Sequence, residues 1–498
     1  MKTGTLFRHL LSASSLILLS CAGCMKLGPD YHRPEPGFAV PAAYRQADAY
    51  EHGGIRDDRW WMVFGDPTLN HLVEEVLRNN LDIRKATAVL LQVASRFDAA
   101  TAERFPRLDL QAGIQRQRQT TQVTVPVLQG TSFQMKTVDK RITIDTRSLS
   151  LPASFEVDLW GRLARAEEAA RADLLQALEN RRTIAQGIVA ETVNLYLNME
   201  ALERRIGIAR QSIELYRHSL SLVEGRYRRG LASILDVRQA RRVLARAQAS
   251  LPALRQELGI VQQNLALLLG RYPETAPARR QPADYYRLPD PVPPGLPSDL
   301  LERRPDIRAA EARLRALNAR VGVAKASRFP RITLTASFGY ASDELDRLFK
   351  PESELWSIAA GLVQPIFDAG RLKAAQRGAE AAYRAGVVDY AKTVLKAFGE
   401  VERALLTRKM QLERREEIME RLKEARATQE VAELRYKRGL VGYLSVLDAQ
   451  QARYEAEENL VLVELSLLTN RVSLHRALGG GWGEPTNGPG DIGKDPKP

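Results

Sequence analysis

The residues most able to do chemistry in this 498-residue chain are two cysteines and six histidines, and their spacing argues against a reaction centre. Cys21 and Cys24 stand at the end of an apolar leader, so the mature chain has no pair for an internal disulfide. The histidines are too scattered to form a metal-ligand set, and no phosphate-binding loop or nucleophile–base pair is evident. We therefore predict no enzyme activity, no metal site and no cofactor other than a covalent lipid.

The cysteines suit that lipid chemistry. The apolar run from Leu10 to Leu19 is too short to span a membrane and is typical of a secretory leader. The small residues before Cys24 resemble a bacterial lipoprotein processing site, in which the cysteine is lipidated and becomes the new N-terminus. We predict a signal peptide over residues 1–23 and a lipid on Cys24, with Cys21 as the alternative. Met25 rather than aspartate after Cys24 implies sorting to the outer membrane.

The helices that must position any functional residue occur twice. Residues 161–270 have the pattern of a long helix, a sharp turn and a returning helix, and residues 370–478 repeat it. The displacement is a constant 209 residues, as in Gly161-Arg162-Leu163 and Gly370-Arg371-Leu372, Gly230-Leu231 and Gly439-Leu440, and Leu269-Gly270 and Leu478-Gly479. Apolar residues three and four apart predict coiled-coil packing in both copies, interrupted at Asn470 in the second. At ~1.5 Å per residue, each long helix would extend roughly 100 Å.

Between the helices the period changes to two. Apolar and polar residues alternate in two pairs of segments, at about 107–158 and about 331–366, which predicts two β-hairpins with one apolar face each. Phe105-Pro106-Arg107 recurs as Phe329-Pro330-Arg331 at a displacement of 224, so the first hairpin holds 15 more residues than the second. We place these extra residues in an exposed polar loop between about Arg116 and Arg147.

Four such strands are typical of a transmembrane β-barrel but do not close one. An open edge in lipid leaves backbone groups unsatisfied at several kcal/mol each, so several copies must share one barrel. Side chains fill the interior of an eight-stranded barrel, so a conducting pore favours three chains over two. We predict a mainly α-helical fold with a transmembrane β part, assembled as a trimer.

The remaining segments connect these parts. Trp60 and Trp61 are predicted to be packing anchors, and Asp66 to be the N-cap of a helix that continues to Glu103 in more than one piece. Pro252 should kink or split the first returning arm. The predicted domains are an extended strap over 24–66, a first repeat over 67–270, a proline-rich connector over 271–299, a second repeat over 300–481 and a disordered tail over 482–498.

The formal net charge of +13 could indicate nucleic-acid binding. Arginine and glutamate interleave along the helices, however, as in Glu413, Arg414-Arg415 and Glu416-Glu417, and no basic stretch carries a series of interleaved aromatic residues. This pattern is typical of solvated helix faces. We predict no nucleic-acid partner.

Together these segments resemble the TolC-type outer-membrane efflux factors, in particular the lipoprotein subfamily of tripartite efflux systems. The resemblance covers almost the whole chain from Cys24 onward. Its matching pieces are Gly28-Pro29-Asp30-Tyr31, Trp60 to Leu69, the connector from Gly295 to Ile307, and Arg435-Tyr436-Lys437-Arg438-Gly439-Leu440.

The resemblance implies a homotrimer with a 12-stranded β-barrel in the outer membrane and a 12-helix α-barrel tunnel in the periplasm. It also implies an inner-membrane pump and a periplasmic adaptor as partners. The function implied is a passive exit duct for drugs or other small toxic molecules. A duct for secreted protein or metal ions is the alternative, and a coiled-coil adaptor without a pore is a distant one.

The resemblance also assigns site residues. The two helical turns would meet the adaptor, through Arg229, Gly230 and Leu231 and through Arg438, Gly439 and Leu440. The periplasmic gate would lie at Leu444 and Asp448, four residues apart on one helix face. Tyr436 and Asp236 would hold the second hairpin against the first, although a role in starting its own helix is the alternative for Asp236. Val441 stands where some family members have an arginine that ties the closed state.

Overall fold

The computed structural model describes residues 25–35, 37–45, 59–130, 132–273, 292, 293, 295 and 297–480. The predicted signal peptide, Cys21, Cys24, most of the connector and the predicted tail lie outside the described residues. The chain divides into two compact units. Unit 1 combines the N-terminal residues up to Arg33 with Gln92–Leu174 and Ala312–Gly386. Unit 2 combines Pro34–Leu91, Leu175–Glu311 and the residues from Val387 onward.

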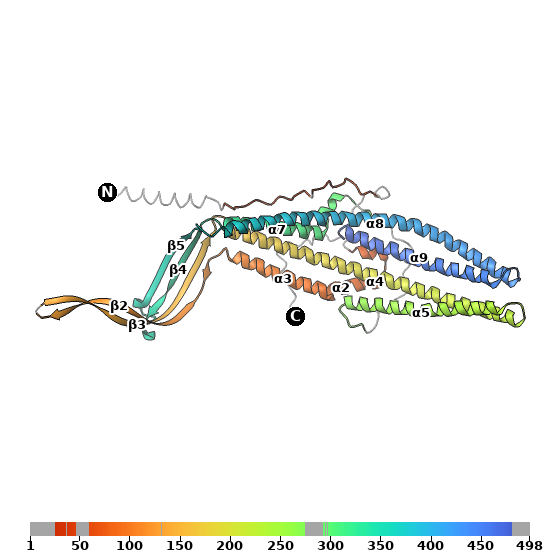
Figure 1. Cartoon of the computed structure of the whole chain (residues 1–498), viewed down its shortest axis with the longest axis horizontal. Coiled ribbons are helices and arrows are strands. Elements are labelled where there is room, and N and C mark those ends of the chain that lie inside the picture. The colour runs from red at the N-terminus through yellow and green to blue at the C-terminus, as the bar shows by residue number, and fades with distance from the viewer. Residues whose placement is uncertain are drawn as a thin grey trace. The chain divides into compact units, whose positions relative to one another are not determined.

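Helices make up most of the described chain (Figure 1). The α-helices are α2 (Pro67–Asn79), α3 (Leu81–Ala102), α4 (Arg162–Arg228), α5 (Ile234–Leu268), α6 (Leu300–Arg303), α7 (Pro305–Ala326), α8 (Arg371–Lys437) and α9 (Tyr443–Ala477). Short 3₁₀ turns are η2 (Trp60–Phe64), η3 (Pro297–Asp299), η4 (Leu345–Arg347) and η5 (Pro351–Ser353). None of the described helices combines the length and the apolar character needed to cross a membrane.

The predicted repeat is confirmed in the helix lengths. Helices α4 and α8 each have 67 residues, α5 and α9 each have 35, and α3 and α7 each have 22. Helix α5 folds back on α4, and α9 on α8 (Figure 1). Ion pairs Arg241–Glu224 and Arg421–Glu455 join the two arms of each hairpin. Pro252 does not split α5, which is continuous through it.

Unit 1 contains an antiparallel sheet of β1 (Arg107–Leu108), β2 (Gln111–Gln129), β3 (Ser132–Val157), β4 (Arg331–Ser342) and β5 (Glu354–Val363). Both β1 and β2 pair with β3, which pairs with β4, which pairs with β5. The two segments β1 and β2 are one predicted strand interrupted at residues 109–110, where the Asp109 N–H donates to the Pro152 carbonyl at 3.0 Å. The four predicted strands are therefore present, with the first in two pieces.

The prediction of a polar loop between Arg116 and Arg147 is wrong. Strands β2 and β3 pair without a break from Gln111↔Ser150 to Gln129↔Ser132, so the 15 extra residues lengthen the hairpin. The extension carries β-branched threonines and valines, which favour strands, and cross-strand contacts such as Thr124 with Thr137 at 3.2 Å. Gly130, with φ of +70°, accommodates the reversal. Apolar alternation alone missed the strand because its apolar residues, such as Val125 and Leu128, lie on both faces among polar ones.

The sheet exposes large apolar side chains. Ile114 is 83% exposed, Trp356 71% and Ile358 79%. Every residue of β5 is exposed in this chain. One apolar face and two outer strands are therefore left without a partner within the described chain.

The N-terminal segment of unit 1 explains the Gly28-Pro29-Asp30-Tyr31 sequence. Arg165, which is buried, donates to Asp30 at 2.8 Å and lowers the pKa of that carboxyl. A Cβ on Gly28 would lie 2.5 Å from the Gly322 Cα, so only glycine allows this close approach. The guanidinium of Arg315 lies 5.2 Å from the centre of the Tyr31 ring. This sequence therefore fixes the strap to helices α4 and α7.

Unit 2 has its main core where η2 and α2 cover the first helical hairpin. Trp60 and Trp61 are buried in this core, as predicted. Asp66 is confirmed as the N-cap of α2, because its carboxylate accepts from the Thr68 N–H at 2.7 Å. The Tyr196 hydroxyl donates to the other oxygen of Asp66 at 2.6 Å. The cap thereby joins α2 to α4.

The predicted break in the helix after Asp66 lies at Asn80. Its side-chain oxygen accepts from the Asp82 N–H at 2.9 Å, and its amide donates to the Leu268 carbonyl at 2.9 Å. In the second repeat Arg304 takes the place of Asn80 and donates to the Ala477 carbonyl at 2.8 Å. Position 304 follows 80 by 224 residues and 477 follows 268 by 209, the displacements of the sequence repeat. The repeat therefore extends to a single tertiary contact, even though the residue type differs.

His475 is a buried histidine in the same unit. Its ring stacks on Trp60 with centroids 5.1 Å apart, and neither ring nitrogen has a hydrogen-bond partner among the described residues. Burial, and then the charge of Arg471, lower the pKa of His475 from 6.5 to about 3. Between these two values the unfolded chain binds a proton that the folded chain refuses, so stability falls as pH falls.

His475→Phe should remove this acid sensitivity, since phenylalanine keeps the stacking on Trp60. From pH 6.5 to pH 5 the wild type should lose about 2 kcal/mol per chain more than the variant. The measurement is thermal unfolding by circular dichroism at both pH values, with the exposed His218→Gln as the control. Equal losses in wild type and His475→Phe would contradict the prediction.

Candidate functional site at the helical turns

Both long helices end in the same reversal. Gly230 has φ of +74° and Gly439 of +75°, a conformation that favours glycine. Two backbone hydrogen bonds close each turn, as in a Schellman motif. Each of the four is 2.9 Å long: Gly230 N–H to Tyr227 O, Leu231 N–H to Arg226 O, Gly439 N–H to Tyr436 O, and Leu440 N–H to Arg435 O.

The predicted adaptor-docking residues lie on the surface of these turns. Leu231 and Leu440 are each 62% exposed, and Arg229 and Arg438 are exposed beside them. A turn glycine does not require a leucine after it, and covering such a side chain releases roughly 1.5–3 kcal/mol. Each turn therefore presents an apolar contact point next to a positive charge.

The returning helices begin differently. Ser233 and Asp236 form a capping box at the start of α5, in which Asp236 accepts from the Ser233 N–H at 2.9 Å and Ser233 accepts from the Asp236 N–H at 3.1 Å. Helix α9 begins after Gly442 without a side-chain cap. Asp236 thus serves its own helix start, the alternative role, and no hydrogen bond joins it to the hydroxyl of Tyr436.

One contact between the two hairpins includes Tyr436, as predicted, but its partner Arg226 was not predicted from the sequence. Arg226 of α4 donates to the carbonyls of Tyr436 and Lys437 at 3.2 and 3.3 Å, at the C-terminus of α8. Its guanidinium lies 4.8 Å from the centre of the Tyr436 ring. A cation at a helix C-terminus and over an aromatic face is favourable on both counts.

The same contact includes two further residues. Ser219 of α4 lies 3.2 Å from the hydroxyl of Tyr443 in α9, and the rings of Tyr443 and Tyr436 are 5.6 Å apart. Burial raises the pKa of both tyrosines, so they are neutral at physiological pH. We call Ser219, Arg226, Tyr436 and Tyr443 the tip contact. The repeated Arg-Tyr pair of each turn was the available sequence signal for it.

The predicted gate residues lie beside the tip contact. Val446 and Leu447 of α9 are buried in a core shared by both hairpins. Leu444, 52% exposed, and Asp448, also exposed, lie on the α9 surface outside that core. These two side chains are thus available to a neighbour or to a lumen, and their role as a gate stays a prediction.

Farther along unit 2, ion pairs connect α4 to α9. Arg204 bonds Glu464 at 2.8 Å, and Arg205 bonds Glu458 at 2.9 Å. Glu464 also accepts from Arg415 of α8 at 3.3 Å. The side chain of Glu464 is only 6% exposed, so Arg204 and Arg415 together stabilise one buried negative charge.

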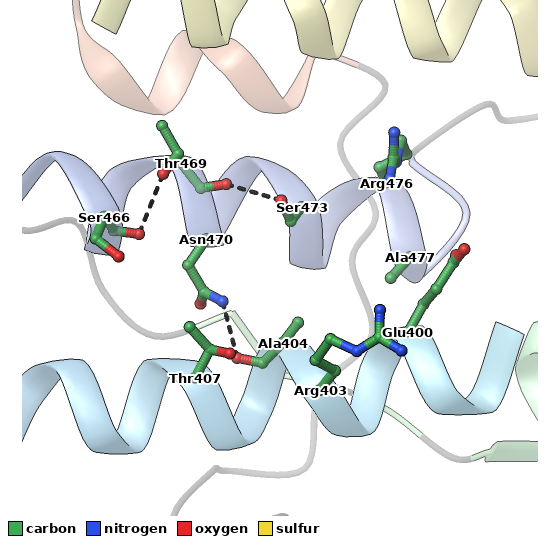
Figure 2. Close-up of a pocket in the computed structure, with 10 residues that line it drawn as sticks. All are labelled: Glu400, Arg403, Ala404, Thr407, Ser466, Thr469, Asn470, Ser473, Arg476 and Ala477. Carbon is green, nitrogen blue, oxygen red and sulfur yellow. Dashed lines mark hydrogen bonds between the residues drawn. The ribbon is translucent and has the colours of Figure 1, made fainter. Parts of the chain in front are cut away.

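A hollow of about 310 Å³ lies between α8 and α9 (Figure 2). Asn470, which interrupts the apolar pattern, donates here to the Ala404 carbonyl at 3.0 Å. Thr469 and Ser473 bond carbonyls of their own helix. These hydroxyls satisfy the backbone rather than forming a nucleophile–base arrangement. Among the described residues no cluster of His, Cys, Asp and Glu could hold a metal ion.

The described chain thus combines two matched helical hairpins with an open antiparallel sheet that has an apolar face. The family model described as "Outer membrane efflux protein" matches residues 72–271 and 296–480. The chain belongs to this family, whose members are channel proteins. It is an outer-membrane efflux channel.

Relatives and solved structures support the assignment. The chain is 34% identical over 480 residues to "Pyoverdine export outer membrane protein OpmQ" of Pseudomonas putida, covering 96% of this chain and 98% of that one. It is 31% identical over 474 residues to "Cation efflux system protein CusC" of Escherichia coli, covering 94% and 97%. The solved outer-membrane channel OprN superimposes with a TM-score of 0.82 at 30% identity, covering 92% of this chain and 99% of that one.

The tip contact yields a prediction that does not depend on transport. Arg226→Ala removes two charge-assisted hydrogen bonds to the end of α8, which should destabilise this contact by roughly 2 kcal/mol. Backbone amides around Tyr443 should then exchange with deuterium faster, as measured by mass spectrometry. Tyr436→Phe is the matched control and should leave exchange unchanged, because its hydroxyl has no partner. Faster exchange in the control alone would contradict the account.

Proposed function

We propose that three copies of this chain form one exit duct, with a 12-stranded β-barrel in the outer membrane and a 12-helix α-barrel in the periplasm. The observation that carries this proposal is the open sheet. Its outer strands, β1 with β2 on one side and β5 on the other, have backbone groups facing no strand of the described chain. In a membrane those groups must pair, and another copy supplies the matching edge.

Strand lengths support the membrane placement. Strand β4 has 12 residues and β5 has 10, close to the roughly 9–11 that a tilted strand needs to cross a bilayer. Strand β3 pairs with β4 only from Arg147 to Val157. The earlier part of β3 pairs with β2 alone and, on this proposal, extends beyond the bilayer as a two-stranded ribbon.

The duct that we propose is passive and works with an inner-membrane pump and a periplasmic adaptor, which docks at the helical turns. Cys24 would carry a lipid anchor in addition to the barrel. We propose drugs or other small toxic molecules as cargo. The names of relatives include solvent, toluene and cation efflux, so the cargo of an individual member is set by the pump rather than by this architecture.

The assembly is tested with the purified full-length protein. Light scattering with detergent correction should give the mass of a trimer, and planar bilayers should show stable conducting events. A monodisperse monomer without conductance would overturn the proposal. A conducting dimer would overturn the strand count on which it rests.

Docking is tested at the exposed leucines. Leu231→Asp combined with Leu440→Asp should abolish efflux-dependent drug resistance in cells that contain the cognate pump and adaptor, while trimers still assemble. The reason is that a carboxylate cannot enter an apolar contact without loss of its hydration. Leu231→Met with Leu440→Met is the control and should retain resistance. Unchanged resistance in the aspartate double variant would remove docking from these turns.

The gate is tested at Leu444 and Asp448. In a trimer, three copies of Asp448 would surround one axis and attract cations. Asp448→Ala should therefore lower the cation-to-anion permeability ratio, and Leu444→Ala should raise single-channel conductance. Both are measured in planar bilayers with a salt gradient. If neither quantity changed, the constriction would lie elsewhere.

A further inference from the structure

We propose that the interface between copies repeats the contact between the two helical hairpins of one chain, so that Glu413 of one copy pairs with Arg255 of the next. This inference rests on the proposed trimer and assigns the residues that join its subunits. The partner is a second copy of this chain. The surface involved is α8 of one copy against α5 and the end of α4 of its neighbour.

The first step is that the internal repeat relates tertiary contacts as well as helix lengths. The displacement of 209 residues relates α4 to α8 and α5 to α9 with equal lengths. The hydrogen bonds from Asn80 to Leu268 and from Arg304 to Ala477 show that it also relates tertiary contacts. A contact in the first repeat therefore predicts its counterpart in the second.

The second step applies this displacement to the ion pair between hairpins. Arg204 of α4 bonds Glu464 of α9. Position 204 corresponds to Glu413 in α8, and position 464 corresponds to Arg255 in α5. Both charges are reversed, so the counterpart pair is again complementary. A reversal at only one of the two positions would have placed like charges together.

The third step is that these two residues lack partners in the chain itself. Glu413 and Arg255 are both exposed, and neither side chain forms an ion pair or hydrogen bond in the part of the chain that the structure describes. Their counterparts, in contrast, are 17% and 6% exposed at the side chain. The contact between hairpins is thus formed once within the chain, and the equivalent surface on the other side of each hairpin has no partner in the described chain.

The tip contact gives the same result independently. Arg226 lies on the ring of Tyr436, and the corresponding residues are Arg435 and Tyr227. Arginine and tyrosine are retained at both positions. Tyr436 is 5% exposed, whereas Tyr227 is 44% exposed and Arg435 is exposed. Arg435 of one copy would therefore cover Tyr227 of the next.

Apolar residues on α8 agree. Leu197 and Ala201 of α4 are 1% and 4% exposed, while their counterparts Leu406 and Met410 of α8 are 49% and 43% exposed. In such an interface the first hairpin of one copy packs against the second hairpin of the next. This arrangement is head-to-tail, and it forms a ring when the rotation between copies closes. The same apolar positions would then be covered around the whole ring.

The test is a charge exchange in the full-length protein. Glu413→Arg and Arg255→Glu should each lower the midpoint temperature of trimer dissociation in detergent by a few degrees, because each places like charges in contact. The double variant should recover most of that loss. Singles without effect, or a double variant as unstable as the worse single, would overturn the inference.

Cross-linking separates this inference from the proposed trimer. In the variant with both Glu413→Cys and Arg255→Cys, a short bis-maleimide should link copies into covalent dimers and trimers. The reagent spans the space left by two long side chains, which is too wide for a disulfide to bridge. Arg204→Cys with Glu464→Cys is the matched control and should cross-link within one chain only. Trimers of the Glu413→Cys, Arg255→Cys variant that do not cross-link between copies would overturn the interface. Wild-type protein that forms no trimer would instead overturn the proposed function.

Discussion

The structure depends on the coverage of long apolar helix faces. A helix satisfies its own backbone, but its apolar side needs another element against it. Helices α4 and α8 have 67 residues each, and their returning partners α5 and α9 have 35. Within unit 2 the first hairpin is also covered by the 13-residue α2, whereas the second repeat has the four-residue α6 in the corresponding place. Two copies of one motif are therefore covered unequally by the helices that the structure describes.

The tips of the two helical hairpins also differ, in how their returning helices begin. Helix α5 has its own capping box, which is typically worth ~1 kcal/mol, whereas α9 starts at Tyr443 without a side-chain cap. Tyr443 is instead 2% exposed, held against Tyr436 and Ser219. The start of α9 is thus stabilised by the first hairpin, while the start of α5 is stabilised locally. Loss of the tip contact should consequently affect α9 more than α5.

Features of the fold and of the candidate site could be predicted from the sequence where they depend on residues close together in the chain. Helix lengths, the Gly230 and Gly439 turns and the Asp66 cap follow from periodicity and backbone preference, which act over a few residues. The extended hairpin was missed because its apolar residues near Thr124 lie on both faces and form no continuous apolar face, so pairing between strands had to supply the signal. The role of Arg226 was missed because it depends on a helix end 210 residues away. Tyr436 and Asp236 were predicted to hold the second hairpin against the first together, although the carboxylate of Asp236 caps its own helix.

The sheet leaves backbone groups unpaired at its edges, and the helices leave apolar side chains exposed. These two kinds of surface together limit the assemblies that the chain can form. Exposed apolar side chains such as Trp356 can be covered by lipid or detergent, but the backbone groups of β5 and β2 can be satisfied in a membrane only by another strand. The exposed face of α8 around Leu406 would be covered by another helix in the interface that we propose. A coiled-coil adaptor would account for the helix face and leave the sheet unexplained, and a barrel closed with an unrelated protein would leave the helix face open. In the assembly that we propose, a second copy of the same chain supplies both a matching strand and a matching helix.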